Sequence, residues 1–273
     1  FDSGLFAASN RYVLRTGGTV LTDYLAVGTN VNGGGLEGPW TLSATIPRAS
    51  LGGGNYSLAL VASDYDPEYV GDIMVAETPG ELIARGEDPF QPFAALLSSH
   101  DVRIGNLECV VATTGTAEEK PYTFRADPRT LPVLKRHFDA VSLANNHSGD
   151  FGKAAFAEQL ALMDTAGLPY FGGGRDATAA HAPWIVERNG VRIALLGYVE
   201  FKPRSFEADA SRPGVAWSGE DDDVIEDIIA ARRVHRADIV IPFMHWGWED
   251  EPDPIPRLRA FARRMIDAGA DMV

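Results

Sequence analysis

Three apolar segments, each starting just after an aspartate, constrain the fold of this chain more than any other feature. They occupy residues 101–108, 138–150 and 238–247, and stretches with the apolar spacing of helices lie between them. Continuous apolar runs of this length are typical of strands that are buried on both faces of a parallel sheet. Alternation of such strands with helices predicts an α/β fold. A fourth segment of the same kind begins at residue 268 and the chain ends at residue 273, so we expect a fourth strand that is truncated at the C-terminus.

The segment 138–150 ends in a dense group of polar side chains. Asn145, Asn146, His147 and Asp150 follow its apolar run around a glycine-containing turn. Ligands of open α/β sheets bind beyond the carboxyl ends of the strands, where these residues are expected. An amide, an imidazole and a carboxylate at this point indicate a metal site or an acid–base site. The same residue types cap helices and form turns, so this segment alone fits a helix N-cap equally well.

The other two segments also end on potential ligands. Asn106 and Glu108 close the first run, and His245 closes the last. Delivery of such residues by three strands to one sheet edge favours a site over three unrelated turns. A divalent cation also needs anionic oxygen ligands, and the carboxylate-rich segment 63–74 offers Asp72.

Other polar residues fit ordinary structural roles. Asp64 and Asp66 are interpreted as part of a solvated turn, and His181 as a packing residue. The acidic run 220–223 lacks the ligand spacing of a calcium loop and precedes a helical pattern. Acidic side chains stabilise the N-terminal end of a helix, so we interpret this run as a helix start.

Composition argues against several classes of function. The net charge of −14 disfavours a surface for nucleic acid or an anionic membrane, because both require a basic patch. Lys120, Arg125 and Arg129 are nevertheless close enough in sequence to form a local basic pocket for an anionic substrate. Cys109 is the single cysteine, which excludes an intrachain disulfide and a thiolate cluster, and its apolar context predicts a buried, inert thiol.

Targeting signals are not recognisable in this sequence. No apolar run approaches the roughly 20 residues that a membrane-spanning helix needs. The chain begins at Phe1 without an initiator methionine, a signal peptide or an anchor, so we expect a processed or excised segment.

The first part of the chain differs from the rest. Residues 1–56 contain three glycine clusters between short β-like runs, which predicts a small β appendage of unknown role. Residues 57–273 form the predicted main domain. Its expected helices cover residues 82–100, 128–137, 153–166, 224–233 and 256–268, and residues 184–197 form an expected hairpin with an Asn-Gly turn.

Four motifs follow one another along the main domain. They are Gly71-Asp72-Ile73-Met74, Asn106-Leu107-Glu108, Asn145-Asn146-His147 with Asp150 and Gly152, and His245-Trp246-Gly247, and Lys120-Pro-Tyr-Thr-Phe-Arg125 accompanies them. In this order they resemble the bacterial capsule synthesis family, of the CapA/PgsA type associated with poly-γ-glutamate capsules. The resemblance extends from about residue 68 to the C-terminus. It implies a calcineurin-like metallophosphoesterase fold, a four-layer αββα sandwich that is incomplete at its C-terminus.

The resemblance also implies roles for individual residues. Asp72, Glu108, Asn146 and His245 would bind one or two divalent ions of manganese, zinc or iron. His147 would be a general acid that Asp150 orients. Residues expected to contact an anionic polymer or phosphoester substrate are Lys120, Arg125, Asn145 and Trp246, the last as the wall of a pocket.

Two departures from the related phosphoesterases leave two hypotheses open. Met74 stands where those enzymes usually carry a histidine, and the late Gly-His-x-Pro-His motif would follow Val273. The first hypothesis is a metal-dependent hydrolase of phosphoester or amide bonds, favoured by the Asn146, His147 and Asp150 set. The second is a non-catalytic factor that binds polymer or other capsule synthesis and export proteins, favoured by Met74. Either would be extracytoplasmic or associated with the cell envelope, by the same resemblance.

Overall fold

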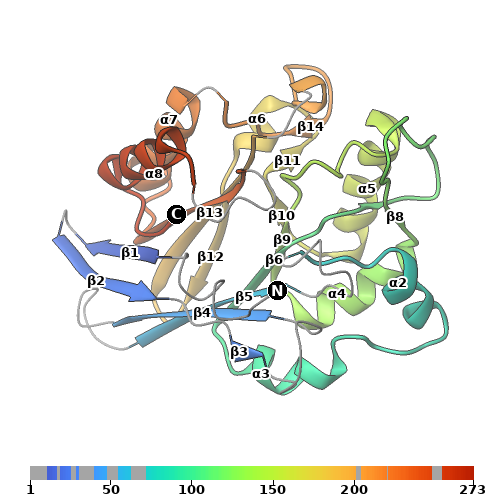
Figure 1. Ribbon diagram of the computed structural model, residues 1–273, viewed down its shortest axis with the longest axis horizontal. Helices are drawn as coiled ribbons and strands as arrows, with labels where there is room; N and C mark the ends of the chain where they lie inside the picture. Colours follow the sequence, from blue (N-terminus) through green and yellow to red (C-terminus); the bar gives the residue numbers. More distant parts are fainter. Residues whose placement is uncertain are drawn as a thin grey trace.

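The computed structural model describes two kinds of segment. For residues 11–16, 19–25, 29–30, 40–47 and 55–62 it describes the backbone, and for residues 72–200, 204–219, 221–247 and 254–273 it also describes the side chains. Figure 1 shows helices on both sides of a central β region, with α7 and α8 on one side and α2, α4 and α5 on the other. Asp64 and Asp66, which were interpreted as part of a solvated turn, lie outside the described residues, as do Gly71 and the three glycine clusters of residues 1–56.

The larger sheet has six strands and carries the first two apolar segments. Its order is β10 (Tyr170–Phe171), β9 (Ala140–Ser142), β6 (Val102–Asn106), β5 (Asn55–Ala62), β4 (Trp40–Pro47) and β3 (Thr29–Asn30). The four strands from β10 to β5 are parallel, whereas β4 and β3 are antiparallel to their neighbours. The β4–β5 pairing therefore continues the sheet across residue 56, and the predicted domain boundary there stays a prediction.

The smaller sheet has three strands and carries the third apolar segment. β12 (Trp184–Arg188) and β13 (Val191–Val199) form the expected hairpin, and β15 (Ile239–His245) lies parallel to β13. Asn189 and Gly190 both have positive φ angles, 53° and 79°, as the predicted Asn-Gly turn requires. The described residues also form three two-stranded pairs: β1 (Arg11–Thr16) with β2 (Thr19–Leu25), β7 (Val110–Val111) with β8 (Arg125–Ala126), and β11 (Gly173–Gly174) with β14 (Gly214–Val215).

The two larger sheets pack face to face through an apolar core. Alternate residues of each strand point to opposite faces, so one face of β13 contributes Ile193 and Leu195 to this core. The larger sheet contributes Ile104 and Phe171 from its facing strands. Burial of each such side chain stabilises the fold by about 1.5–3 kcal/mol. At one end of the interface the backbones approach closely, since a Cβ atom on Gly197 would lie 2.9 Å from the Cα atom of Gly172.

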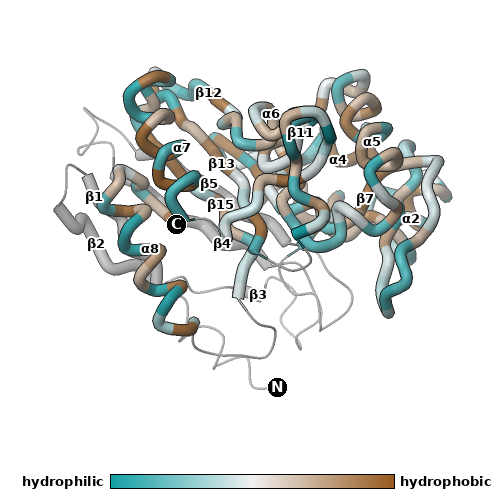
Figure 2. The backbone as a smooth tube through the Cα atoms, turned by 90° about the horizontal axis from the view of Figure 1, so that it is seen from above, coloured by the Kyte–Doolittle hydropathy of each residue, from teal (hydrophilic) through white to brown (hydrophobic). Residues whose placement is uncertain are grey.

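Helices cover the outer face of each sheet. On the smaller sheet, α7 (Asp221–Arg233) and α8 (Pro256–Ala268) pack on the other face of β13 through buried residues such as Ile228 and Phe261. In Figure 2, α8 alternates between hydrophilic and hydrophobic colours along its length, as an amphipathic helix does. α6 (Ala177–His181) lies beside β11 and contributes to the same core.

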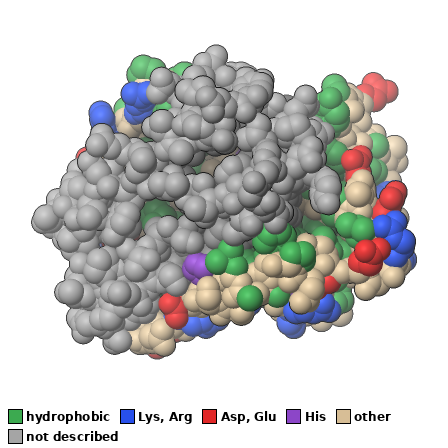
Figure 3. Space-filling view, turned by 60° about the horizontal axis from the view of Figure 1, so that its bottom comes forward, with side chains coloured by type: hydrophobic (Ala, Val, Ile, Leu, Met, Phe, Trp, Pro, Cys, Tyr) green, Lys and Arg blue, Asp and Glu red, His purple; other side chains and the backbone are tan. Residues whose placement is uncertain are grey.

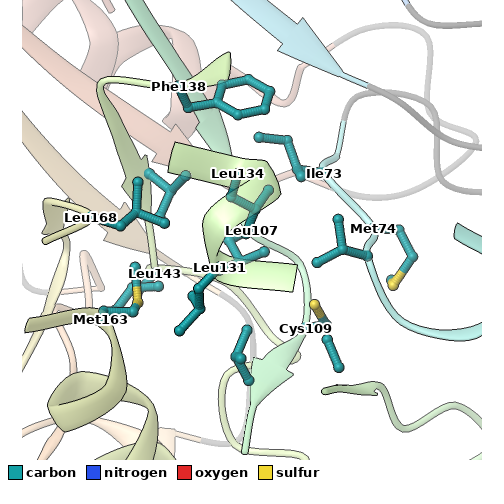
Figure 4. Packing of buried hydrophobic residues seen from close by; sticks show 14 of the residues in the cluster. Ile73, Met74, Leu107, Cys109, Leu131, Leu134, Phe138, Leu143, Met163 and Leu168 are labelled. Carbon is teal, nitrogen blue, oxygen red and sulfur yellow. The ribbon is translucent and has the colours of Figure 1, made fainter. Parts of the chain in front are cut away.

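The larger sheet is covered by α2 (Glu77–Ala84), α3 (Ala94–Ser98), α4 (Leu131–His137) and α5 (Gly152–Ala166). Leu134 of α4 and Met163 of α5 meet Leu107 and Leu143 in a continuous apolar cluster, shown in Figure 4. Helices, two sheets and helices thus form four layers, and the predicted four-layer αββα sandwich is confirmed.

Two expected elements differ from the prediction. The helical pattern expected over residues 82–100 is divided, since α2 ends at Ala84, Gly86 has a φ of 86°, and the next helix begins at Ala94. Pro89 and Pro92 in the intervening segment disfavour a continuous helix. The fourth strand expected from residue 268 does not form in the described chain: α8 continues to Ala268, and Asp271 then donates one backbone hydrogen bond to Val240 of β15.

Candidate metal centre

Four segments bring polar side chains to one place at the carboxyl ends of β6, β9 and β15. Asn106 and His245 are the last residues of β6 and β15, and the turn 145–150 follows β9. Asp72 is positioned by the next residue, Ile73, which forms an isolated parallel bridge with Leu107 just beyond β6. The predicted convergence of these segments is therefore found.

Asp72, Glu108 and His245 form the centre of this group. Each offers a ligand atom, and these atoms all lie within 4.8 Å of one another. Glu108 is buried, whereas Asp72 and His245 are partly exposed. Two carboxylates and an imidazole are a donor set that suits a borderline divalent cation such as zinc or manganese.

The electrostatics of the group favour a cation. Burial, followed by the nearby charge of Asp72, raises the pKa of Glu108 well above its usual range. The His245 side chain is only 17% exposed, and its removal from water, together with the neighbouring His147, lowers its pKa to about 4, so its ring is neutral at pH 7. A neutral imidazole has a lone pair available for a metal, and a cation would relieve the repulsion between the two carboxylates.

Asn146 contacts the His245 ring. Its Oδ1 lies 2.7 Å from Nε2 of His245, and the same nitrogen lies 3.4 Å from Oε1 of Glu108. An N–H donated from a metal-binding histidine to a neighbouring oxygen fixes the orientation of the ring. Asn146 thus orients His245 in this structure, and its predicted role as a metal ligand stays a prediction.

A second pair, His147 and Asp150, lies in the same turn. Nδ1 of His147 is 2.8 Å from Oδ2 of the fully buried Asp150, which also accepts a 2.6 Å hydrogen bond from the backbone N–H of Phe124. The Phe124 ring packs against His147, with 4.6 Å between the ring centroids. The sequence prediction missed Phe124, although it stands in the quoted motif beside Arg125.

Lys120 joins this pair from the exposed loop between β7 and β8. Its Nζ forms an ion pair with Oδ1 of Asp150 and donates to the carbonyl oxygen of Asn146 at 3.1 Å. The backbone N–H of Glu118 donates to the carbonyl of Asp150 at 2.8 Å. At the start of the loop, the carboxylate of Glu158 accepts hydrogen bonds from the backbone and hydroxyl groups of Thr113 and Thr114. The loop is therefore fixed to α5 at one end and to the His147 turn at the other.

Three predicted substrate contacts have other partners. Arg125 donates to the carbonyls of Thr114 and Gly115 and lies over the Phe151 ring. Neighbouring residues of a strand point to opposite sides, so Arg125 points away from His147 because Phe124 faces it. Trp246 follows His245 and packs against Phe261 of α8. Substrate binding by these two residues stays a prediction.

Asn145, the third of them, is buried and holds the turn together. Its Oδ1 accepts hydrogen bonds from the His147 N–H and the Ser148 hydroxyl, and its Nδ2 donates to Asn106 and to the Leu107 carbonyl. All of these bonds are internal to the site. A contact between Asn145 and substrate also stays a prediction.

The residues assigned structural roles behave as expected where they are described. Cys109 is buried, and burial raises the pKa of its thiol to about 12. His181 packs near Tyr198 and pairs with Asp227 at 2.7 Å. Asp221, Asp222 and Asp223 form the first turn of α7, so the interpretation of the acidic run as a helix start is confirmed. Arg129 pairs with Asp127, and its predicted place beside Lys120 in a basic pocket stays a prediction.

Met74 is buried in the apolar cluster of Figure 4 near Cys109. A thioether in this cluster has the surroundings of a packing residue.

On the face in Figure 3, basic and acidic side chains of the described part are interspersed. None of the helices in the described ranges has the length and hydropathy needed to cross a bilayer.

Comparison with known proteins relates the sequence of this chain to capsule synthesis proteins. A family model described as "Bacterial capsule synthesis protein PGA_cap" matches residues 68–273. The "PGA biosynthesis protein CapA" of Bacillus subtilis is 31% identical over 211 residues, which cover 75% of this chain and 55% of that protein. A "Probable polyglutamine synthesis accessory protein" of Mycobacterium tuberculosis is 36% identical over 186 residues, which cover 63% of this chain and 48% of that protein. The chain thus spans about half the length of these curated relatives.

Solved structures give weaker matches. A hypothetical protein from Thermus thermophilus superimposes with a TM-score of 0.41 at 17% identity, over 73% of this chain and 62% of that chain. The NAD nucleotidase of Haemophilus influenzae gives a TM-score of 0.39 at 13% identity, over 81% of this chain and 33% of that chain. Similarity at this level carries no functional conclusion.

Proposed function

The chain belongs to the bacterial capsule synthesis protein family PGA_cap, and from this premise we propose that it is a metal-dependent hydrolase acting in capsule polymer synthesis. Its substrate would be an anionic polymer of the polyglutamate type, cleaved at an amide bond, or a phosphoester. The observation that carries the proposal is the convergence of Asp72, Glu108 and His245 beside the His147–Asp150 pair.

The donor set fits a divalent cation. Asp72, Glu108 and the neutral His245 would hold it, and Asn146 would orient the His245 ring. A bound cation of this kind polarises the scissile group and lowers the pKa of water. Glu108 is buried beside a second carboxylate, which is the situation that a bound cation stabilises most.

The proton chemistry falls to His147. Asp150 accepts from Nδ1, so the other ring nitrogen, Nε2, is the one that can pass a proton to the leaving group. Lys120 and the Phe124 N–H hold Asp150, and Phe124 supports one face of the imidazole. These contacts fix the ring, which is what a proton donor needs for efficient transfer.

A non-catalytic role is the second candidate. Met74 supports it, because a packing residue stands where the related phosphoesterases carry a histidine. In that case the protein would bind polymer or other capsule synthesis and export proteins without turnover. Association with the cell envelope is part of both proposals and rests on the names of the relatives.

Turnover by the purified protein separates the candidates. The chain and a form extended past Val273 would be incubated with poly-γ-glutamate and with bis(p-nitrophenyl) phosphate, each with manganese or zinc. We expect His147→Ala to lower turnover at least about 100-fold, the usual effect of losing a general acid. His181→Ala is the matched control, since His181 pairs with Asp227 at 2.7 Å, much as His147 pairs with Asp150 at 2.8 Å.

Each result has a clear meaning. Equal turnover by wild type and His147→Ala would refute the general-acid role. Metal bound by the wild type without hydrolysis of either substrate would favour the assembly factor. Elemental analysis completes the test, because Glu108→Ala should lower the amount of bound metal, and an undiminished content would remove Glu108 from the ligand set.

A further inference from the structure

The side chain of Asn106 lies in the middle of the proposed metal ligands. Its Nδ2 lies 2.7 Å from Oδ1 of Asp72 and 3.3 Å from Nδ1 of His245. The same nitrogen donates a hydrogen bond to Oε2 of Glu108. One amino group thus contacts an atom of all three residues. Asn106 is only 2% exposed, so these contacts form away from water.

The direction of the Asn106 amide follows from its neighbours. Asn145 must present its Oδ1 to the backbone N–H of His147, which can only donate. Its Nδ2 is therefore directed at Oδ1 of Asn106, at 3.0 Å. The Nδ2 of Asn106 therefore faces the carboxylates. If the Asn106 amide were reversed, its NH₂ group would meet the NH₂ group of Asn145, and its oxygen would meet the carboxylate oxygens.

An amide NH₂ group and a metal ion compete for such a position. The NH₂ group carries a partial positive charge and two donors, which match the two carboxylates. A zinc ion would sit about 2.0–2.2 Å from its oxygen and nitrogen ligands. Nδ2 contacts Asp72, Glu108 and His245 at once, so an ion that bound these three residues would need much of the same space.

We propose that Asn106 is an internal competitor of the metal, whose amide takes the cation position in the metal-free protein and must turn away before a divalent cation binds. This inference rests on the proposed metal site. A residue that supports a metal site orients the ligands and raises the metal affinity. Asn106 would do the opposite, because it stabilises the metal-free protein and lowers the metal affinity.

Metal affinity measures this competition directly. Chelator-treated wild type, Asn106→Ala and Asn106→Ser would be titrated with manganese chloride by isothermal calorimetry. We expect both variants to bind manganese about tenfold more tightly, which corresponds to about 1.4 kcal/mol. In EDTA they should melt at a lower temperature than the wild type, because the carboxylates lose their donor, and added manganese should restore more stability to them than to the wild type.

Gln159→Ala is the matched control. Gln159 is another buried amide, 1% exposed, on the inner side of α5, and its side-chain atoms have no hydrogen-bond partner among the described residues. It should leave manganese affinity unchanged. Near-ultraviolet circular dichroism verifies folding, and Asn106→Ser replaces Asn106→Ala if the alanine variant is not folded.

The outcomes separate this inference from the proposed function. Manganese binding that is unchanged or about 10–100-fold weaker in the Asn106 variants would overturn it, since weaker binding is the effect of losing a supporting residue. If neither the wild type nor the variants bound manganese or zinc, the metal site itself would be refuted and the competitor with it. Binding by the variants alone would support the inference most strongly.

Discussion

Replacement of Asp150 by alanine should destabilise the protein strongly even if no metal is present. The carboxylate is fully buried and has three partners: the Phe124 N–H at 2.6 Å, the His147 ring at 2.8 Å and the Lys120 ammonium. Alanine would leave two buried donors without an acceptor, at about 1–3 kcal/mol each. The Lys120 side chain is 32% exposed and can turn to water, so its loss adds at most about 1 kcal/mol.

The sum predicts a loss of about 2–7 kcal/mol in the free energy of unfolding for Asp150→Ala. Asp150→Asn keeps one acceptor oxygen and should lose roughly half as much. For a domain of this size the alanine variant should melt roughly 10 °C lower than the wild type. Urea unfolding in EDTA, followed by circular dichroism, measures these differences for a cooperative transition.

Asp164→Ala is the control for this experiment. Asp164 also forms an ion pair, with Arg175 at 2.6 Å, but its side chain is 48% exposed. Its removal should cost less than about 1 kcal/mol. If Asp150→Ala lost no more stability than Asp164→Ala, the conclusion that the buried contacts of Asp150 stabilise the fold by several kcal/mol would be refuted.

Two further predictions concern residues around the site. Burial alone would raise the pKa of Glu158, but the hydrogen bonds from Thr113 and Thr114 lower it to about 2. A lowered pKa stabilises the folded protein above pH 4.5, and this stabilisation is lost as the pH falls towards 2. The free energy of unfolding of the wild type, measured in urea, should therefore exceed that of Glu158→Gln by up to about 1 kcal/mol at pH 7 and by little near pH 2. A difference that does not change with pH would contradict this. The Cys109 thiol, with a pKa of about 12, should resist a thiol reagent at pH 8 in the folded protein and react within minutes in urea. Rapid reaction in the folded protein would contradict the burial of this thiol.

The parts of the fold that depend on local pattern were predictable from the sequence. The hairpin at Asn189–Gly190 follows from turn chemistry and is found as expected. The helix expected over residues 153–166 is also found as α5, and its buried residues Phe156, Leu160 and Met163 follow the helical period. α5 ends where Gly167 adopts the left-handed conformation, with a φ of 65°. The division of the expected helix 82–100 was also readable, since Gly86, Pro89 and Pro92 lie within it.

The contacts that depend on long-range register were less predictable. The meeting of Asp72 with His245 requires two sheets to be aligned, and only the shared pattern of strand ends indicated it. The central position of Asn106 has a partial signal, because residues 106 and 108 lie two apart at a strand end and so share a side. The same alternation explains why Trp246 points away from His245, whereas the partners of Arg125 depend on where the loop from Thr113 lies.

The site joins two sheets that are otherwise separate hydrogen-bonded units. Asp72 and Glu108 extend from the larger sheet and His245 from the smaller one, so an ion bound by all three would act as a cross-link between them. Sliding of one sheet over the other would change the distances from His245 to Asp72 and Glu108. The spacing of the ligands therefore depends on packing residues between the sheets, such as Phe171 and Ile193. A repacked interface would alter the size of the ion that the site accepts.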